Sequence, residues 1–242
     1  MWFIWTARNN SKHRHIMLRP VAIIRNIRYY IATACTTDLI KAEHWKGWSS
    51  LAQDFHVRVG GCVRTLVSLI TWSKPSAPWF KLNTDGCRSN QGLIATGGLI
   101  RDPGGCVQLA FHGFLGEGSI IKAELSAILQ GLIICKQHQF FPVWIETESA
   151  VALLIINSDH SSWELRHILT RIKDIRANHP TFITHIHREG NAPADALASL
   201  GMQKQTYEEI TCSTLDKRIA GLCKMDQLGC PNMRIDRKII NR

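Results

Sequence analysis

The order of the periodic segments after residue 78 is the feature that most limits what this chain can fold into. Alternating apolar and polar residues predict three successive strands, near 79–85, through GLIATGGLIR and through CVQLAFHGF. Asp102-Pro103-Gly104-Gly105 lies between the second and the third strand, and Pro followed by Gly at a turn centre is typical of a hairpin. These three strands are therefore expected to be antiparallel.

Helices and strands then alternate along the chain. The pattern predicts a helix over 119–138, a strand in PVWIE, helices near 149–157 and 162–178, a strand in TFITHIH and a final helix. Asn191 is expected to cap that helix, with Pro193 in its first turn and Gly201 just past its end. This order predicts an α/β domain with a five-stranded mixed sheet and flanking helices.

Composition divides the chain into four parts. WSKPSAPW, at 72–79, holds two prolines and two serines and is the best linker candidate. We expect a basic, mainly helical N-terminal segment at 1–72, a linker at 73–78, the α/β domain at 79–202 and a basic C-terminal tail at 203–242.

The positive charge lies outside the central domain. Residues 1–78 carry 11 Lys and Arg against 3 Asp and Glu, residues 79–202 carry 10 against 11, and residues 203–242 carry 8 against 5. Isoleucines and a tyrosine recur at helical spacing among arginines over 23–31, which predicts a basic amphipathic helix. Basic ends around a near-neutral domain indicate a polyanionic partner such as nucleic acid, the alternative being a solubilising surface.

Several classes of protein are disfavoured by the sequence. No uninterrupted apolar run approaches the roughly 18 residues that a membrane span needs. The eight cysteines are scattered without CxxC pairs or a secretory leader, so we expect neither a zinc site nor a disulfide framework. We expect an intracellular monomer, nuclear or cytoplasmic, with organelle import as the alternative because the N-terminus is basic and acid-free.

Four carboxylates fall at related places in this outline. Asp85 ends the first strand in KLNTDG, and Glu124 borders the apolar arc of the helix over 119–138. Glu148 follows the fourth strand, and Asp195 lies in the first turn of the last helix. Each has a plain structural interpretation as a turn residue or a helix-dipole partner. Together they predict a site of hard oxygen ligands, which suit Mg²⁺ or Mn²⁺.

The stretches KLNTDG, GGLIRDPGG, KAELSAILQGL, IETES and HIHREGNAPADALASLG resemble the type 1 ribonuclease H domain of plant non-LTR retroelements, the reverse-transcriptase-associated family. The resemblance covers about residues 79–202. It implies a ribonuclease H-like fold and endonucleolytic hydrolysis of the RNA strand of RNA–DNA hybrids with two Mg²⁺ or Mn²⁺ ions. The segment WFIWTARNN and the helix after it are similar to what precedes this domain in such polyproteins.

The resemblance assigns roles to particular residues. Asp85, Glu124 and Asp195 match the metal-binding acids, and His185 falls where many members have a histidine that assists product departure. Candidates for contact with the hybrid are Gly86, Ser89 and Asn90.

The chain also departs from the family pattern. Glu148 stands where the family usually has Asp, which predicts reduced activity, and Glu146 is the one acid nearby that could substitute. Ile120 and Ile121 replace residues that are usually polar before the helix Glu.

Two functions of different classes follow. The first is a metal-dependent ribonuclease H that acts on RNA–DNA hybrids. The alternative is a catalytically weak or inactive nucleic-acid-binding remnant of a retroelement. An integrase or exonuclease with the same fold is disfavoured by the ending HIHREGNAPAD.

Overall fold

The computed structural model describes residues 2–14, 16–17, 19–37, 39–40, 45, 47–54, 62–158 and 162–240. The chain divides into two compact units, one formed by Met1–Leu66 with Asp236–Arg242 and the other by Val67–Ile235. Within the described part of the chain, no helix combines the length and the apolar character that crossing a bilayer requires.

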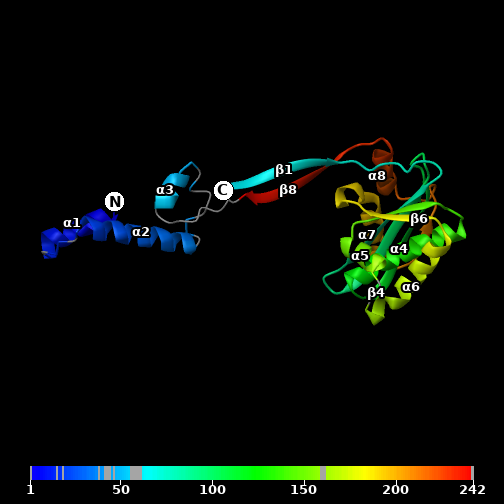
Figure 1. Ribbon diagram of the computed structural model, residues 1–242, viewed down its shortest axis with the longest axis horizontal. Helices are drawn as coiled ribbons and strands as arrows, with labels where there is room; N and C mark the ends of the chain where they lie inside the picture. Colours follow the sequence, from blue (N-terminus) through cyan, green and yellow to red (C-terminus); the bar gives the residue numbers. More distant parts are fainter. Residues whose placement is uncertain are drawn as a thin grey trace. The chain divides into compact units, whose positions relative to one another are not determined.

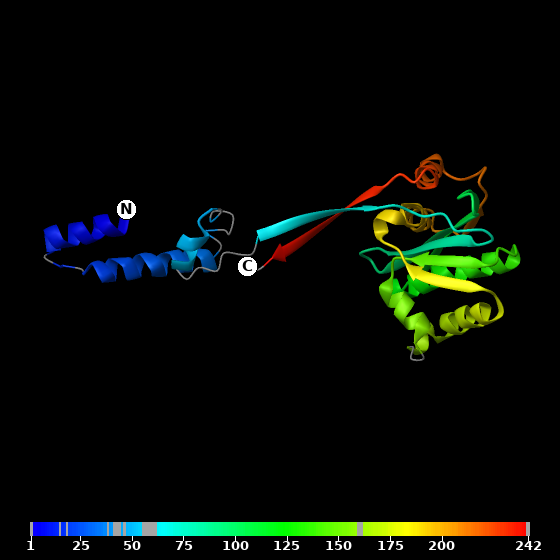
Figure 2. The same cartoon turned by 45° about the horizontal axis from the view of Figure 1, so that its top comes forward.

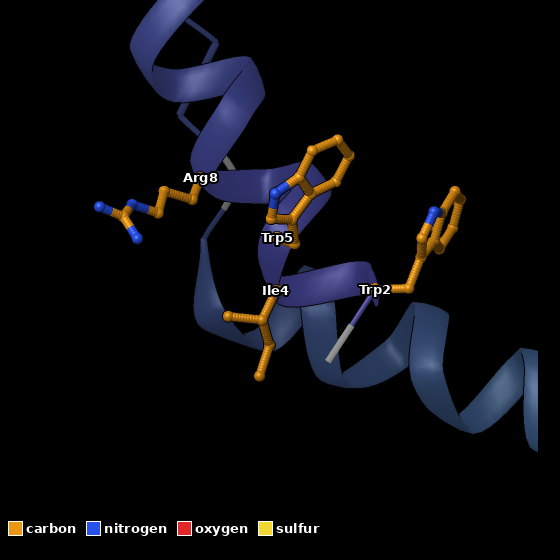
Figure 3. A pocket seen from close by; sticks show the side chains of 4 residues that line it. All are labelled: Trp2, Ile4, Trp5 and Arg8. Atoms are coloured by element: carbon orange, nitrogen blue, oxygen red, sulfur yellow. The ribbon is translucent and has the colours of Figure 1, made fainter.

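The described residues of the first unit are mainly helical up to Asp54, and those at 62–66 and 236–240 belong to strands. Its helices are α1 (Trp2–Arg14), α2 (Pro20–Thr36) and α3 (Ser49–Asp54). The rings of Phe3 and Tyr30 meet edge to face at 5.5 Å, which joins α1 to α2. Figure 3 shows four further α1 side chains around a shallow surface depression, namely Trp2, Ile4, Trp5 and Arg8. The basic helix predicted over 23–31 lies within α2.

The second unit is built on a mixed sheet (Figure 1). Its strands are β2 (Phe80–Arg88), β3 (Leu93–Arg101), β4 (Val107–Glu117), β5 (Val143–Thr147), β6 (Thr181–His185) and β7 (Glu208–Ile210), in the order β6-β5-β2-β3-β4-β7. The first three are antiparallel, as predicted, and β5 and β6 run parallel to β2. All five expected strands are present, and β7 adds a sixth that pairs with β4. A separate two-stranded sheet joins β1 (Cys62–Ile70) and β8 (Asn232–Ile240).

Helices cover both faces of the mixed sheet (Figure 2). One face carries α4 (Ile120–Gln137), α5 (Ala150–Asn157) and α6 (Trp163–Asn178), and the other carries α7 (Ala192–Lys204) and α8 (Lys217–Gln227). Leu82 and Ile100 belong to the first core, whereas the neighbouring Leu99 belongs to the second. This division follows from the alternation of side chains along a strand.

Two glycines let the helices approach the sheet closely. A Cβ at Gly86 would lie 2.5 Å from the backbone nitrogen of Glu124, and one at Gly97 would lie 2.1 Å from that of Ala198. Because no larger residue fits at either position, α4 and α7 contact the sheet through its backbone. Gly201, expected just past the end of α7, lies inside the helix, where a Cβ would meet the backbone of Gly113 at 3.0 Å.

The second unit is wider than the domain expected at 79–202. Trp72, assigned to the N-terminal segment, is 2% exposed and donates through Nε1 to Asn83 Oδ1 at 3.2 Å. At the other end, β7 and α8 occupy the region expected to be a tail. Both extensions are held because they bury apolar and polar groups against the sheet.

Candidate active site

Asp85 lies within β2, on the face of the sheet that α7 covers, and not at the end of the strand as expected, because β2 stays paired with β3 as far as Arg88. In the antiparallel register of β2 and β3, Asp85 is opposite Gly97, the glycine against which α7 packs. Asp85 is 6% exposed. The close approach of α7 therefore brings the first turn of that helix toward a buried carboxylate.

Glu124 reaches the same end of β2 from the opposite face. Ser119, where the helix was expected to begin, caps α4 by accepting a hydrogen bond from the backbone nitrogen of Lys122 at 3.2 Å. Glu124 follows in the second turn, is 7% exposed, and accepts a long hydrogen bond from Thr147 Oγ1 at 3.5 Å. Thr147 pairs with Thr84 in the parallel register of β5 and β2, so Glu124 lies where β5 and its pairing with β2 end.

Glu148 follows β5 directly and is held by Asn191. Asn191 Nδ2 donates to Glu148 Oε1 at 3.1 Å and to the backbone carbonyl of Thr84 at 3.0 Å. The expectation that Asn191 caps α7 is met by its position only, since its side chain makes no capping hydrogen bond. The amide is instead committed to the sheet and to Glu148.

Asp195 lies in the first turn of α7 and has a cationic partner. Arg188 Nη2 donates to Asp195 Oδ1 at 3.0 Å, and the two side chains are 74% and 38% exposed. The negative potential of the nearby acids raises the pKa of Arg188, with Asp195 as the largest cause. Arg188 lies in the 3₁₀ turn Arg188–Gly190 and is the cation that pairs with Asp195.

Burial and neighbouring negative charges raise the pKa of three of the carboxylates, Asp85, Glu124 and Glu148. Burial, and then the charges of Glu148 and Asp195, raise the pKa of Asp85 to about 7. Burial, followed by Asp85 and Glu148, raises the pKa of Glu124 to about 8, and burial with Asp195 raises that of Glu148. Four acids thus share one region in which negative charge is poorly compensated.

This donor set fits a divalent cation chemically. Carboxylate oxygens are the ligands that Mg²⁺ and Mn²⁺ prefer, and a 2+ charge would relieve the repulsion among the acids. In the described part of the chain, however, no three acidic, histidine or cysteine side chains converge into a complete metal cluster. The charges of the acids therefore interact, but their side chains do not meet at one point.

Glu146, the acid considered as a substitute for Glu148, is engaged elsewhere. It is 6% exposed and pairs with the fully buried Lys81, whose Nζ lies 2.9 Å from Glu146 Oε1. Asn83 Nδ2 donates to its other oxygen at 3.0 Å. Because both oxygens have buried partners, Glu146 is not available to replace Glu148.

The remaining candidates occupy different surroundings. His185 is an exposed residue at the end of β6, and its ring contacts that of His187 at 5.5 Å. Gly86 packs against α4, Ser89 Oγ accepts from the backbone nitrogen of Leu93 at 3.2 Å, and Asn90 is exposed in the turn after β2. Of these four residues, Gly86 interacts with the acids, since its backbone hydrogen bonds lower the pKa of Asp85 and of Glu124.

Sequence reasoning missed two residues of the site, Arg188 and the polar side chain of Asn191. Asn191 was interpreted as a cap because its position before Pro193 is typical of one. Arg188 had a weak signal, since it lies seven residues before Asp195 in a stretch already considered important.

The central part of the chain is similar to known proteins. A family described as reverse transcriptase-like matches residues 83–201, which include all four acids. An Arabidopsis thaliana protein named as a ribonuclease H protein is 29% identical over 170 residues, covering 69% of this chain. That alignment covers 27% of the relative, so the chain spans about a quarter of its length.

Solved structures are similar over half the chain. RNase H1 from the halophilic archaeon Halobacterium salinarum has 22% identity and a TM-score of 0.48, with 52% of this chain and 98% of that chain covered. LC11-RNase H1, solved in complex with an RNA/DNA hybrid, has 25% identity and a TM-score of 0.45, with 52% and 97% covered.

Proposed function

We propose that this chain is a metal-dependent ribonuclease H, because residues 83–201 match a family described as reverse transcriptase-like and lie in a domain built on a mixed sheet. Its reaction would be endonucleolytic hydrolysis of the RNA strand of RNA–DNA hybrids. The observation that carries the proposal is the group of four carboxylates from β2, α4, α7 and the end of β5, in which burial and neighbouring acids raise the pKa of Asp85, Glu124 and Glu148.

The acids would hold Mg²⁺ or Mn²⁺. Asp85 and Glu124 are the buried members, Glu148 is held by Asn191, and Asp195 is the most exposed. A pair of bound ions would supply an activated water and would stabilise the leaving 3′ oxygen. The chain's own part is to keep Asp85 and Glu124 rigid, since Gly86 fixes the distance between their backbones.

Arg188 has a further role in this proposal. Its guanidinium is 74% exposed beside Asp195, so it can rotate toward an incoming phosphate when a metal ion takes over the charge of the carboxylate. Gly86, Ser89 and Asn90 lie on β2 and in the turn after it, where backbone and polar groups would contact the 2′-hydroxyls of the RNA strand. His185 would assist product departure from the exposed end of β6.

The second candidate is a catalytically weak nucleic-acid-binding remnant. One observation that favours it is the ion pair of Asp195 with Arg188. Glu148 adds to this argument, because its longer side chain is already bound to Asn191. In this candidate the basic charge outside the domain would supply the affinity for nucleic acid.

Single-turnover cleavage of a labelled RNA–DNA hybrid distinguishes the two candidates. The full chain is assayed with Mg²⁺ and with Mn²⁺, beside single-stranded RNA and duplex DNA, and Asp85→Asn is the matched inactive control. Cleavage confined to the RNA strand of the hybrid and lost in Asp85→Asn would support the enzyme. Binding of the hybrid without cleavage in either metal would favour the remnant.

A further inference from the structure

A chain of buried polar side chains runs from α8 to the candidate active site. Asp226 Oδ2 lies 2.7 Å from Arg101 Nη1, and Arg101 Nη2 donates to Asn83 Oδ1 at 2.8 Å. Asn83 Nδ2 donates to Asn191 Oδ1 at 3.1 Å, and Asn191 Nδ2 donates to Glu148 Oε1 at 3.1 Å. We call these five residues the polar relay. Its first member lies outside residues 83–201, the range that the family matches.

The relay is sealed from water at its centre. Arg101, Asn83 and Asn191 are all 0% exposed, and Asp226 is 6% exposed. Trp72 covers Arg101, with its ring centroid 3.5 Å from the guanidinium carbon. Because water has little access, each polar group depends on its partner in the protein.

Arg101 and Trp72 together determine which way the amide of Asn83 points, and Asn83 with the backbone carbonyl of Thr84 determines the orientation of the Asn191 amide. A guanidinium and an indole N–H can only donate, so Arg101 and Trp72 require the oxygen of Asn83 to face them. The NH₂ group of Asn83 then faces Asn191 Oδ1, which leaves the NH₂ group of Asn191 facing Glu148. A reversed amide at Asn191 would bring an oxygen against a carboxylate, which is repulsive.

Asp226 keeps Arg101 in place. Cys223 and Ile219, one and two turns earlier in α8, pack into the core beside α7, so the helix is anchored independently of the ion pair. Arg101 Nε is buried with no hydrogen-bond partner among the residues that the structure describes. The guanidinium thus depends on Asp226 for its charge compensation.

We infer that Asp226 and Arg101 are positioning residues that present Glu148 for binding of a divalent cation. Helix α8 is then a part of the functional unit and not an accessory tail. The inference rests on the proposed function, because it gives Glu148 the role of a metal ligand. Partners that orient a metal ligand typically change metal affinity by about 10-fold to 100-fold when they are removed.

The test compares two changes in α8 and its partner strand within the full chain. Arg101→Met combined with Asp226→Leu removes both charges while it keeps apolar volume, which is the kind of replacement that cores tolerate. Ile219→Val is the matched control, because it loosens the same helix without touching the relay. Three quantities are measured, namely the thermal melting profile, the Mn²⁺ dissociation constant and the side-chain amide resonances of Asn191.

The expected result is a double variant that melts cooperatively, binds Mn²⁺ about 10-fold more weakly and shifts the amide resonances of Asn191. Ile219→Val should change neither the Mn²⁺ affinity nor the resonances. A folded double variant with unchanged affinity and unchanged resonances would overturn the inference. Should the double variant not fold, Asp226→Asn, which keeps an oxygen for Arg101 but loses the charge, decides by the same two readouts.

If the proposed function is wrong, the same measurements give a different result. If the parent chain neither binds Mn²⁺ nor cleaves hybrid, the metal role of Glu148 is refuted. The resonances of Asn191 still decide the relay in that case, since they report the orientation of the amide without any metal. Shifted resonances would uphold the relay as a structural device, and unmoved ones would refute it together with the function.

Discussion

Replacing Asp85 by Asn should stabilise the metal-free protein, and by an amount that depends on pH. The fold raises the pKa of Asp85 from 3.8 to about 7. Between these two values the folded protein holds a proton on Asp85 that the unfolded chain has released. The folded state therefore binds more protons, and stability falls as pH rises through this window.

The size of the effect follows from the shift. Each pKa unit corresponds to about 1.4 kcal/mol, so a shift of about three units costs at most about 4 kcal/mol once pH exceeds 7. At pH 4 the unfolded carboxyl is only half ionised and the cost is below about 1 kcal/mol. Asn keeps the shape of the side chain and removes this cost, so its advantage should grow between pH 4 and pH 8.

Thermal melting in the presence of a chelator measures this advantage. For a chain of this size, about 1 kcal/mol shifts the melting temperature by roughly 2–4 °C, so a difference of several degrees is expected at pH 8. Glu117→Gln, which neutralises an exposed carboxylate at the end of β4, is the control and should show no such trend. An Asn variant that gains as much at pH 4 as at pH 8, or gains nothing at pH 8, would refute the reasoning.

Three further predictions concern activity, binding and packing. Glu148→Asp should raise the Mg²⁺-dependent single-turnover rate at least about tenfold, because a carboxylate misplaced by near 1 Å can cost about 100-fold; a slower variant would show a site adapted to Glu. Deleting residues 1–61 should flatten the dependence of log K on log salt, by about 0.9 for each phosphate of duplex DNA that the segment neutralises, and an unchanged slope would contradict this. Gly97→Ala should destabilise the fold by about 3 kcal/mol in urea unfolding, because a Cβ there would lie 2.1 Å from the backbone of α7; Gly221→Ala, with nothing within 4 Å, should be neutral or slightly stabilising.

Local sequence pattern determined most of the central domain. Alternation along 79–85 predicted the strand that carries Asp85, although that strand continues to Arg88, and the 3.6-residue period placed Glu124 on the inner side of its helix, where it is 7% exposed. The order of strands and helices was sufficient to predict a mixed sheet whose first three strands are antiparallel. These features are local because side-chain direction follows from the geometry of each element.

Tertiary structure alone decided the partners of the polar residues. Asn191 has the sequence signature of a cap, yet its amide bonds to a strand 107 residues away, at Thr84. Arg101 pairs with Asp226 across 125 residues, which makes an expected tail part of the domain. Sequence periodicity predicts that a side chain is buried. The identity of its hydrogen-bond or ion-pair partner depends on which distant elements the sheet brings together. Glu146 and Glu148 illustrate the difference, because two acids of the same motif lie on either side of the end of β5, one bound to Lys81 and the other facing the site.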